Sequence, residues 1–204
     1  GIGPEVAVKA AVHSGWPAGL KLVLVGSTQA IVPICRSLKV PLPPAWDPQE
    51  VKTLPRLSIY DPDAGAQCPL PPGRSHPENA RLAVAWIGAA VRQCQAGRFQ
   101  GMVTAPINKE GLKKAGIPYP GHTELLADLT GTRRYAMMLI GGPLRVVLAT
   151  RHIPLAEVPK ALTQPVIEEA VEMAVDGLAW LGVKNRSVAV CALMVSLAKQ
   201  LDLN

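Results

Sequence analysis

Residues 21–26 read KLVLVG, a short run of valine and leucine that ends on a glycine. This pattern is typical of a buried β-strand. Five more segments repeat it, at residues 57–61, 101–106, 135–141, 144–150 and 187–193. The sequence therefore predicts a sheet built from short apolar strands.

Helical patterns lie between several of these strands. Ser75 and Glu78 form a Ser-x-x-Glu capping box, which is typical of a helix start, and apolar residues then recur at helical spacing up to Gly97. A second helix is predicted from about Pro165 to Gly182. Because strands that alternate with helices are joined by crossover connections, the fold class expected is α/β with a largely parallel sheet.

Two regions depart from that alternation. Gly142 and Pro143 separate two strand-like runs, which predicts a local antiparallel hairpin. Residues 40–72 are rich in proline and are expected to form an irregular surface excursion. No internal domain boundary is indicated within residues 1–204.

The composition of the chain excludes several classes of protein. The chain has 204 residues, of which 49% are hydrophobic and 18% charged, and this excludes intrinsic disorder. No apolar run approaches the roughly 18 residues of a membrane span, and residues 1–10 do not resemble a signal peptide. The four cysteines show no zinc-binding spacing and suit reduced thiols. We therefore expect a cytoplasmic protein with no membrane partner.

The net charge of +6 raises the possibility of a nucleic-acid partner. Two features argue against it: lysine and arginine are scattered along the chain, and aromatic residues make up only 4% of it. An enzyme with a small anionic substrate fits this charge at least as well.

Two glycine- or proline-containing turns are candidates for ligand binding. Residues 1–5 (GIGPE) open a predicted helix, whose free N–H groups can hold an anion, although the five residues by themselves favour an ordinary tight turn. Residues 104–109 (TAPINK) lie at the C-terminal end of the predicted central strand at residues 101–106, which is the edge where open α/β sheets bind ligands. There Thr104 and Asn108 could hydrogen-bond a substrate, and Lys109 could contact a phosphate or carboxylate or remain a solvated lysine.

Two histidines are further candidates. His122 lies in a turn before a predicted helix, which it or Thr123 could cap while the imidazole serves as a substrate-binding or acid–base group. A lone surface histidine is the simpler alternative. His152 lies two residues after the strand at residues 144–150, a position suited to a metal ligand or a catalytic base, but one histidine does not make a metal site.

The residues of these motifs, and their order along the chain, resemble those of one protein family. Over residues 1–193 the chain is similar to the 4-hydroxythreonine-4-phosphate dehydrogenases of vitamin B6 biosynthesis. The resemblance rests on GIGPE, SHPENA, TAPINKEGLKKAGIPYPGHTELLADLTGT, LRVVLATRHIPLAEVP and VAVCAL. It implies a two-domain fold like that of the isocitrate and isopropylmalate dehydrogenases, of which only the N-terminal part is present, and a homodimer when the protein is full length.

The resemblance also implies a reaction and its residues. The 3-hydroxyl of 4-phosphooxy-L-threonine is oxidised with NAD or NADP to 2-amino-3-oxo-4-phosphooxybutanoate, which loses carbon dioxide to give 3-amino-2-oxopropyl phosphate. His122 and Thr123 match the substrate-binding pair and His152 matches a ligand of a divalent ion (Zn, Mg or Co). Lys109 matches the family's lysine in the strand-end loop, which implies a catalytic role for it. An ion of this kind would act as a Lewis acid on the alcohol oxygen.

The departures from the family pattern suggest a truncated chain. Arg151 stands where threonine is usual, and the family's Gly-Asp-Pro-Ala before GIGPE is absent. After Leu193 the usual Asn-Pro-His is replaced by a divergent tail at residues 194–204, so that His152 is the single metal histidine left. We therefore expect an inactive fragment. The alternatives are a dehydrogenase for a related phosphorylated four-carbon sugar acid, or a non-catalytic remnant.

Overall fold

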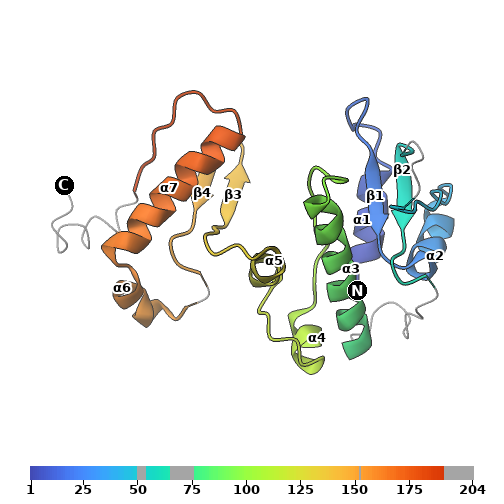
Figure 1. The fold of residues 1–204 in the computed structure, drawn as a ribbon, viewed down its shortest axis with the longest axis horizontal. Coiled ribbons are helices and arrows are strands. Elements are labelled where there is room, and N and C mark those ends of the chain that lie inside the picture. The colour runs from blue at the N-terminus through green and yellow to red at the C-terminus, as the bar shows by residue number, and fades with distance from the viewer. Residues whose placement is uncertain (50–53, 65–75, 152, 191–204) are drawn as a thin grey trace. The chain divides into compact units, whose positions relative to one another are not determined.

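The computed structural model describes residues 1–49, 54–64, 76–151 and 153–190 (Figure 1). The chain forms two compact units, Gly1–Gly131 and Thr132–Asn204. The mixture of helices and strands in them agrees with the predicted α/β class. Within the described ranges, no helix has the length and apolar character that a membrane span requires.

The first unit contains most of the helices. Its elements in chain order are α1 (Gly3–Ala11), β1 (Leu22–Val25), α2 (Thr28–Leu38), β2 (Leu57–Tyr60), α3 (Pro77–Gln95), α4 (Lys109–Lys114) and α5 (His122–Thr130).

The strands β1 and β2 are parallel, as the alternation of strands and helices predicts. Leu22 lies opposite Leu57 and Val25 opposite Tyr60, and α2 forms the crossover between the two strands. The carboxylate of Asp61, just after β2, accepts a hydrogen bond of 2.7 Å from the backbone N–H of Thr28 at the start of α2. This bond ties the carboxyl end of the sheet to the first turn of the helix, where backbone N–H groups lack partners within the helix.

Apolar side chains from three elements form the core of this unit. Val8 of α1, Ile31 and Cys35 of α2, and Ile59 of β2 are buried together. Burial raises the pKa of the Cys35 thiol, which keeps it protonated and in the apolar state that the core requires. The proline-rich excursion joins this core through Ala45, which makes an isolated parallel bridge to Ile59.

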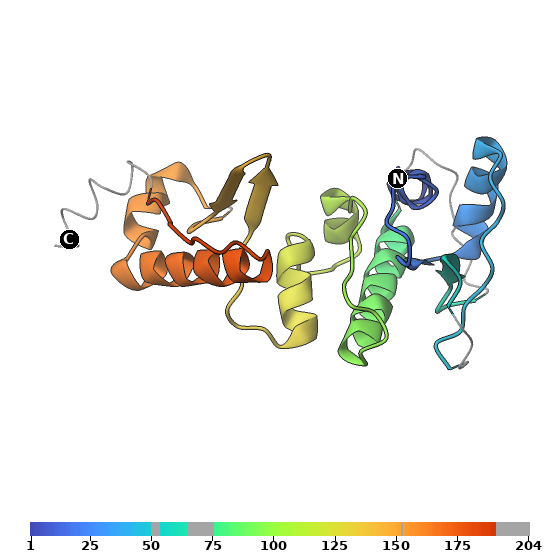
Figure 2. The same ribbon diagram turned by 90° about the horizontal axis from the view of Figure 1, so that it is seen from above.

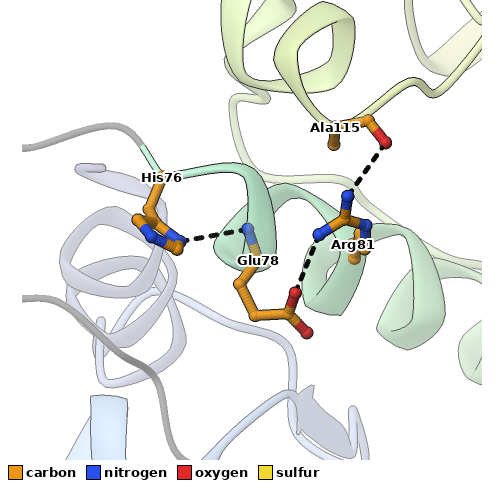
Figure 3. Close-up of polar contacts among 4 residues, drawn as sticks. All are labelled: His76, Glu78, Arg81 and Ala115. Atoms are coloured by element: carbon orange, nitrogen blue, oxygen red, sulfur yellow. Dashed lines mark hydrogen bonds and ion pairs between the residues drawn. The ribbon is translucent and has the colours of Figure 1, made fainter.

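The long helix α3 supports α4. The N-cap of α3 is His76, whose Nδ1 accepts a hydrogen bond of 3.2 Å from the backbone N–H of Glu78 (Figure 3). Ser75 of the predicted capping box lies outside the described residues. One turn along, Arg81 donates to the Glu78 carboxylate at 2.9 Å and to the backbone carbonyl of Ala115 at 3.4 Å, which links α3 to the end of α4.

The second unit is a hairpin packed on a helix (Figure 2). Its elements are β3 (Met138–Gly141), β4 (Leu144–Val147), the short 3₁₀ helix η1 (Leu155–Glu157), α6 (Val158–Ala161) and α7 (Gln164–Trp180). The two strands are antiparallel and Gly142 turns the chain with a φ of +55°, which confirms the predicted hairpin. Met138 reaches α7 at Gly177, where the absence of a side chain makes room for it.

Two of the predicted strands are wrong as far as the structure describes them. Residues 101–106 and residues 187–190 adopt no strand, and residues 191–193 lie outside the described ranges. A strand is defined by hydrogen bonds to a neighbour, and neither segment has a neighbouring strand among the described residues. The side chain of Val103 is accordingly 99% exposed.

Candidate functional site

Two of the candidate turns meet at Ala105. A Cβ atom on Gly3, at the start of α1, would lie 3.3 Å from the Ala105 Cβ and 3.7 Å from the carbonyl oxygen of Pro106. The glycine therefore allows the first turn of α1 to approach the irregular segment before α4 closely. This contact accounts for the GIGPE turn by packing, and it joins two motifs that lie a hundred residues apart in the sequence.

A third candidate residue, His122, also contacts Ala105. The imidazole of His122, the first residue of α5, forms a hydrogen bond with the backbone of Ala105. Burial lowers the pKa of His122 below its usual value of 6.5, and the Ala105 hydrogen bond opposes that shift in part. The side chain is therefore neutral near pH 7, and a neutral imidazole carries one donor nitrogen and one acceptor nitrogen.

The start of α5 differs from the prediction that His122 or Thr123 caps it. Gly121 occupies the N-cap position, and it has no side chain to make a capping hydrogen bond. His122 and Thr123 thus belong to the first turn of the helix, and both side chains are partly exposed. Neither is used as the N-cap, which leaves both able to contact a ligand.

The turn before α5 is held in place at both ends. The Tyr119 hydroxyl donates a short hydrogen bond to the carboxylate of Asp128, and this bond raises the pKa of Tyr119. Leu125, one turn into the helix, is almost completely buried. These contacts fix the position of His122, because they anchor the chain before it and after it.

The position of Lys109 is fixed by the helix start that Asn108 caps. The Asn108 side-chain oxygen accepts a hydrogen bond of 2.6 Å from the backbone N–H of Gly111, which makes Asn108 the N-cap of α4. Lys109 is the first residue of that helix and is exposed, while Leu112 anchors the helix with a side chain that is 1% exposed. The sequence prediction treated Asn108 as a substrate-binding residue, whereas its oxygen serves the helix start.

The predicted metal ligand cannot be placed. His152 lies outside the described residues. Within the part of the chain that the structure describes, no three histidine, cysteine, aspartate or glutamate side chains come together as a metal site would require.

Arg151, in the second unit, was noted in the sequence only as a departure from the family pattern. Its guanidinium carbon lies 4.5 Å from the centre of the Tyr135 ring, a distance typical of a cation–π contact. The tyrosine precedes β3 and the arginine follows β4, so the hairpin between them brings the two side chains together. No spacing rule would have paired them from sequence.

Comparison with known proteins identifies relatives over almost the whole chain. Residues 20–194 match the family described as pyridoxal phosphate biosynthetic protein PdxA. A putative D-threonate 4-phosphate dehydrogenase of Bradyrhizobium diazoefficiens is 38% identical over 196 residues, which cover 95% of this chain and 56% of that protein. A 4-hydroxythreonine-4-phosphate dehydrogenase of Chromobacterium violaceum is 47% identical over 105 residues, covering 52% of this chain and 32% of that protein.

A solved structure shares the fold. The crystal structure of 4-hydroxythreonine-4-phosphate dehydrogenase from Klebsiella pneumoniae superposes with a TM-score of 0.74 at 34% sequence identity. The match covers 89% of this chain and 56% of that one. The chain thus spans about half the length of the relatives that it matches over most of its own length.

Proposed function

The chain belongs to the PdxA family, and from that membership we propose that the whole protein is an NAD- or NADP-dependent dehydrogenase of 4-phosphooxy-L-threonine. The observation that carries the proposal is the family match over residues 20–194, which includes the segment around Ala105 and His122. The relatives named as 4-hydroxythreonine-4-phosphate dehydrogenases support the same reaction.

The proposed reaction has two steps. The substrate's C3–H leaves as a hydride to the nicotinamide ring and its 3-hydroxyl loses a proton, which yields 2-amino-3-oxo-4-phosphooxybutanoate. This 3-oxo acid then loses its carboxyl group as carbon dioxide and gains a proton at C2, leaving 3-amino-2-oxopropyl phosphate.

We assign substrate binding to His122 and Thr123. The imidazole and the hydroxyl lie on adjacent residues in the first turn of α5, and both are partly exposed. A neutral His122 can accept a hydrogen bond from a substrate hydroxyl, which a protonated imidazole cannot do. Lys109 would add a positive charge that attracts the phosphate or carboxylate of the substrate.

A divalent ion (Zn, Mg or Co) is part of this proposal, with His152 as one of its ligands. When bound, the ion supplies a Lewis acid for the alcohol oxygen, and NAD or NADP supplies the oxidant. The described residues do not by themselves form a set of three ligands.

The name of one relative supports D-threonate 4-phosphate as an alternative substrate. One of the relatives that match 95% of this chain is named as a putative D-threonate 4-phosphate dehydrogenase. D-Threonate 4-phosphate is a phosphorylated four-carbon sugar acid, and it carries a hydroxyl where 4-phosphooxy-L-threonine carries an amino group. The same oxidation of a secondary alcohol would apply to it.

We further propose that the full-length protein is a cytoplasmic homodimer. The exposed apolar side chains of Leu139 and Leu144 on the β3–β4 hairpin support an association of this kind, because large apolar surfaces are usually covered in the working assembly.

Substrate profiling tests the proposed function. A version of the protein with the full length of its relatives is supplied with NAD or NADP, a divalent ion and each of the two phosphorylated substrates in turn, and nicotinamide reduction is followed. We expect turnover with 4-phosphooxy-L-threonine and a kcat/KM higher than with D-threonate 4-phosphate. The reverse order would assign the second substrate, and no turnover with either would contradict the dehydrogenase and favour a non-catalytic remnant.

A further inference from the structure

One nitrogen of the Arg151 guanidinium is buried without a hydrogen-bond partner. This atom, Nη1, is shielded from solvent, and it donates to no acceptor among the described residues. An arginine side chain stays charged in proteins and carries only donors. A shielded, charged N–H without an acceptor is costly, and structures that contain one usually supply the acceptor from a ligand or a water.

Other arginines of the chain are partnered differently. In the same unit, Arg134 donates to the carboxylates of Glu169 and Glu172, and Arg145 donates to the backbone carbonyl of Pro143 at 3.0 Å. Arg151 instead stacks on Tyr135. A cation–π contact does not use the N–H groups of the guanidinium, which remain available to an acceptor.

We propose that Arg151 is an anion-binding residue whose Nη1 donates to an oxyanion of the substrate, a carboxylate or a phosphate. The identity of the anion as substrate rests on the proposed function, since both candidate substrates carry these two groups. Arginine suits this role because its N–H groups match the spacing of two oxygens on one carboxylate or phosphate. Tyr135 is then a positioning residue, because it orients the guanidinium and does not contact the anion.

Direct titration of the 204-residue chain tests this assignment without any need for catalysis. Inorganic phosphate probes a phosphate site, and D-threonate, which has the carboxylate but no phosphate, probes a carboxylate site. We expect saturable binding of one of these two probes, and the probe that binds identifies the group. Arg151→Gln should weaken that binding about tenfold or more.

Two further variants make the result specific. Arg145→Gln removes the same charge from an exposed position on the hairpin, and binding should stay within about twofold of the unchanged chain. Tyr135→Leu leaves Arg151 in place but removes the ring, and it should weaken binding by about threefold or more. If Arg151→Gln fails to fold by circular dichroism, Arg151→Lys and Tyr135→Leu replace it.

The outcomes separate this inference from the proposed function. Loss of anion binding in Arg151→Gln, together with no dehydrogenase turnover in the full-length protein, would keep the anion site and remove its assignment to these substrates. Turnover by the full-length protein with an unchanged KM in Arg151→Gln would overturn the inference and keep the function. The inference also fails if neither probe binds the unchanged chain, or if Arg145→Gln weakens binding as much as Arg151→Gln does.

Discussion

His122 combines a perturbed pKa with a fixed position, and both have consequences that can be measured. Its pKa is lowered mainly by burial, so the unfolded chain binds a proton near pH 6.5 more readily than the folded chain does. Stability therefore rises with pH through this range and falls as the pH drops through 6.5 toward the lower folded value.

We expect His122→Gln to make the stability of the chain less dependent on pH on the acid side. Urea unfolding at several pH values between about 5 and 8 measures the free energy of unfolding. The difference in this free energy between the variant and the unchanged chain should grow as the pH falls. His13→Gln, which alters an exposed histidine of the same unit, is the matched control. Parallel stability curves for His122→Gln and the unchanged chain would contradict the assigned burial effect.

The substrate role of His122 gives a separate prediction for the full-length protein. His122→Ala should raise the KM for the substrate about three- to tenfold, the value of one hydrogen bond between neutral groups, and leave the metal content near that of the unchanged protein. His152→Ala should instead lower the affinity for the divalent ion and reduce kcat. Loss of metal from His122→Ala would mean that the two roles are exchanged.

Single residues were predictable where a local pattern marked them. His122 stands out in the sequence because a turn precedes it and a hydroxyl and a carboxylate follow it, and the structure places it beside Ala105. Its low pKa was not predictable, since burial depends on neighbours that are distant in sequence. The stacking of Arg151 on Tyr135 was missed for the same reason, because the β3–β4 hairpin creates it.

At the scale of elements, the short helix α4 depends on its N-cap. We expect Asn108→Ala to destabilise the first unit by about 1 kcal/mol, because the 2.6 Å hydrogen bond to the Gly111 N–H is lost. Asn108→Ser keeps a side-chain acceptor and should cost much less. Urea unfolding of both variants measures the difference, and equal destabilisation would show that the cap is not the cause.

The helices and the hairpin could be predicted from the sequence, but the absence of strands at residues 101–106 and 187–190 could not. The helices α3 and α7 and the β3–β4 turn depend on local periodicity and on glycine and proline, which the sequence displays directly. A strand also needs a neighbour, and sequence composition carries no information on whether one is present. Residues 101–106 have the composition of a strand and lie without a pairing partner among the described residues.

At the scale of the whole molecule, the hairpin presents an uncovered apolar face. Leu139 pairs with Val146 and Gly141 with Leu144, so these four residues share one face, and the three with large side chains are at least 36% exposed. Met138, which alternates with them, reaches α7 from the opposite face. The exposed face is therefore available for contact with other protein surface.

We expect charged substitutions on this face to reduce association without weakening the fold. Leu139→Lys and Leu144→Lys replace side chains that are 53% and 64% exposed, so each should change the free energy of unfolding by no more than about 0.5 kcal/mol. Sedimentation velocity over a range of concentrations should show less self-association than in the unchanged chain. Val103→Lys, which changes a side chain that is 99% exposed in the first unit, separates the hairpin face from exposed apolar residues in general. If all three variants reduce association equally, the effect comes from added charge and not from the hairpin face.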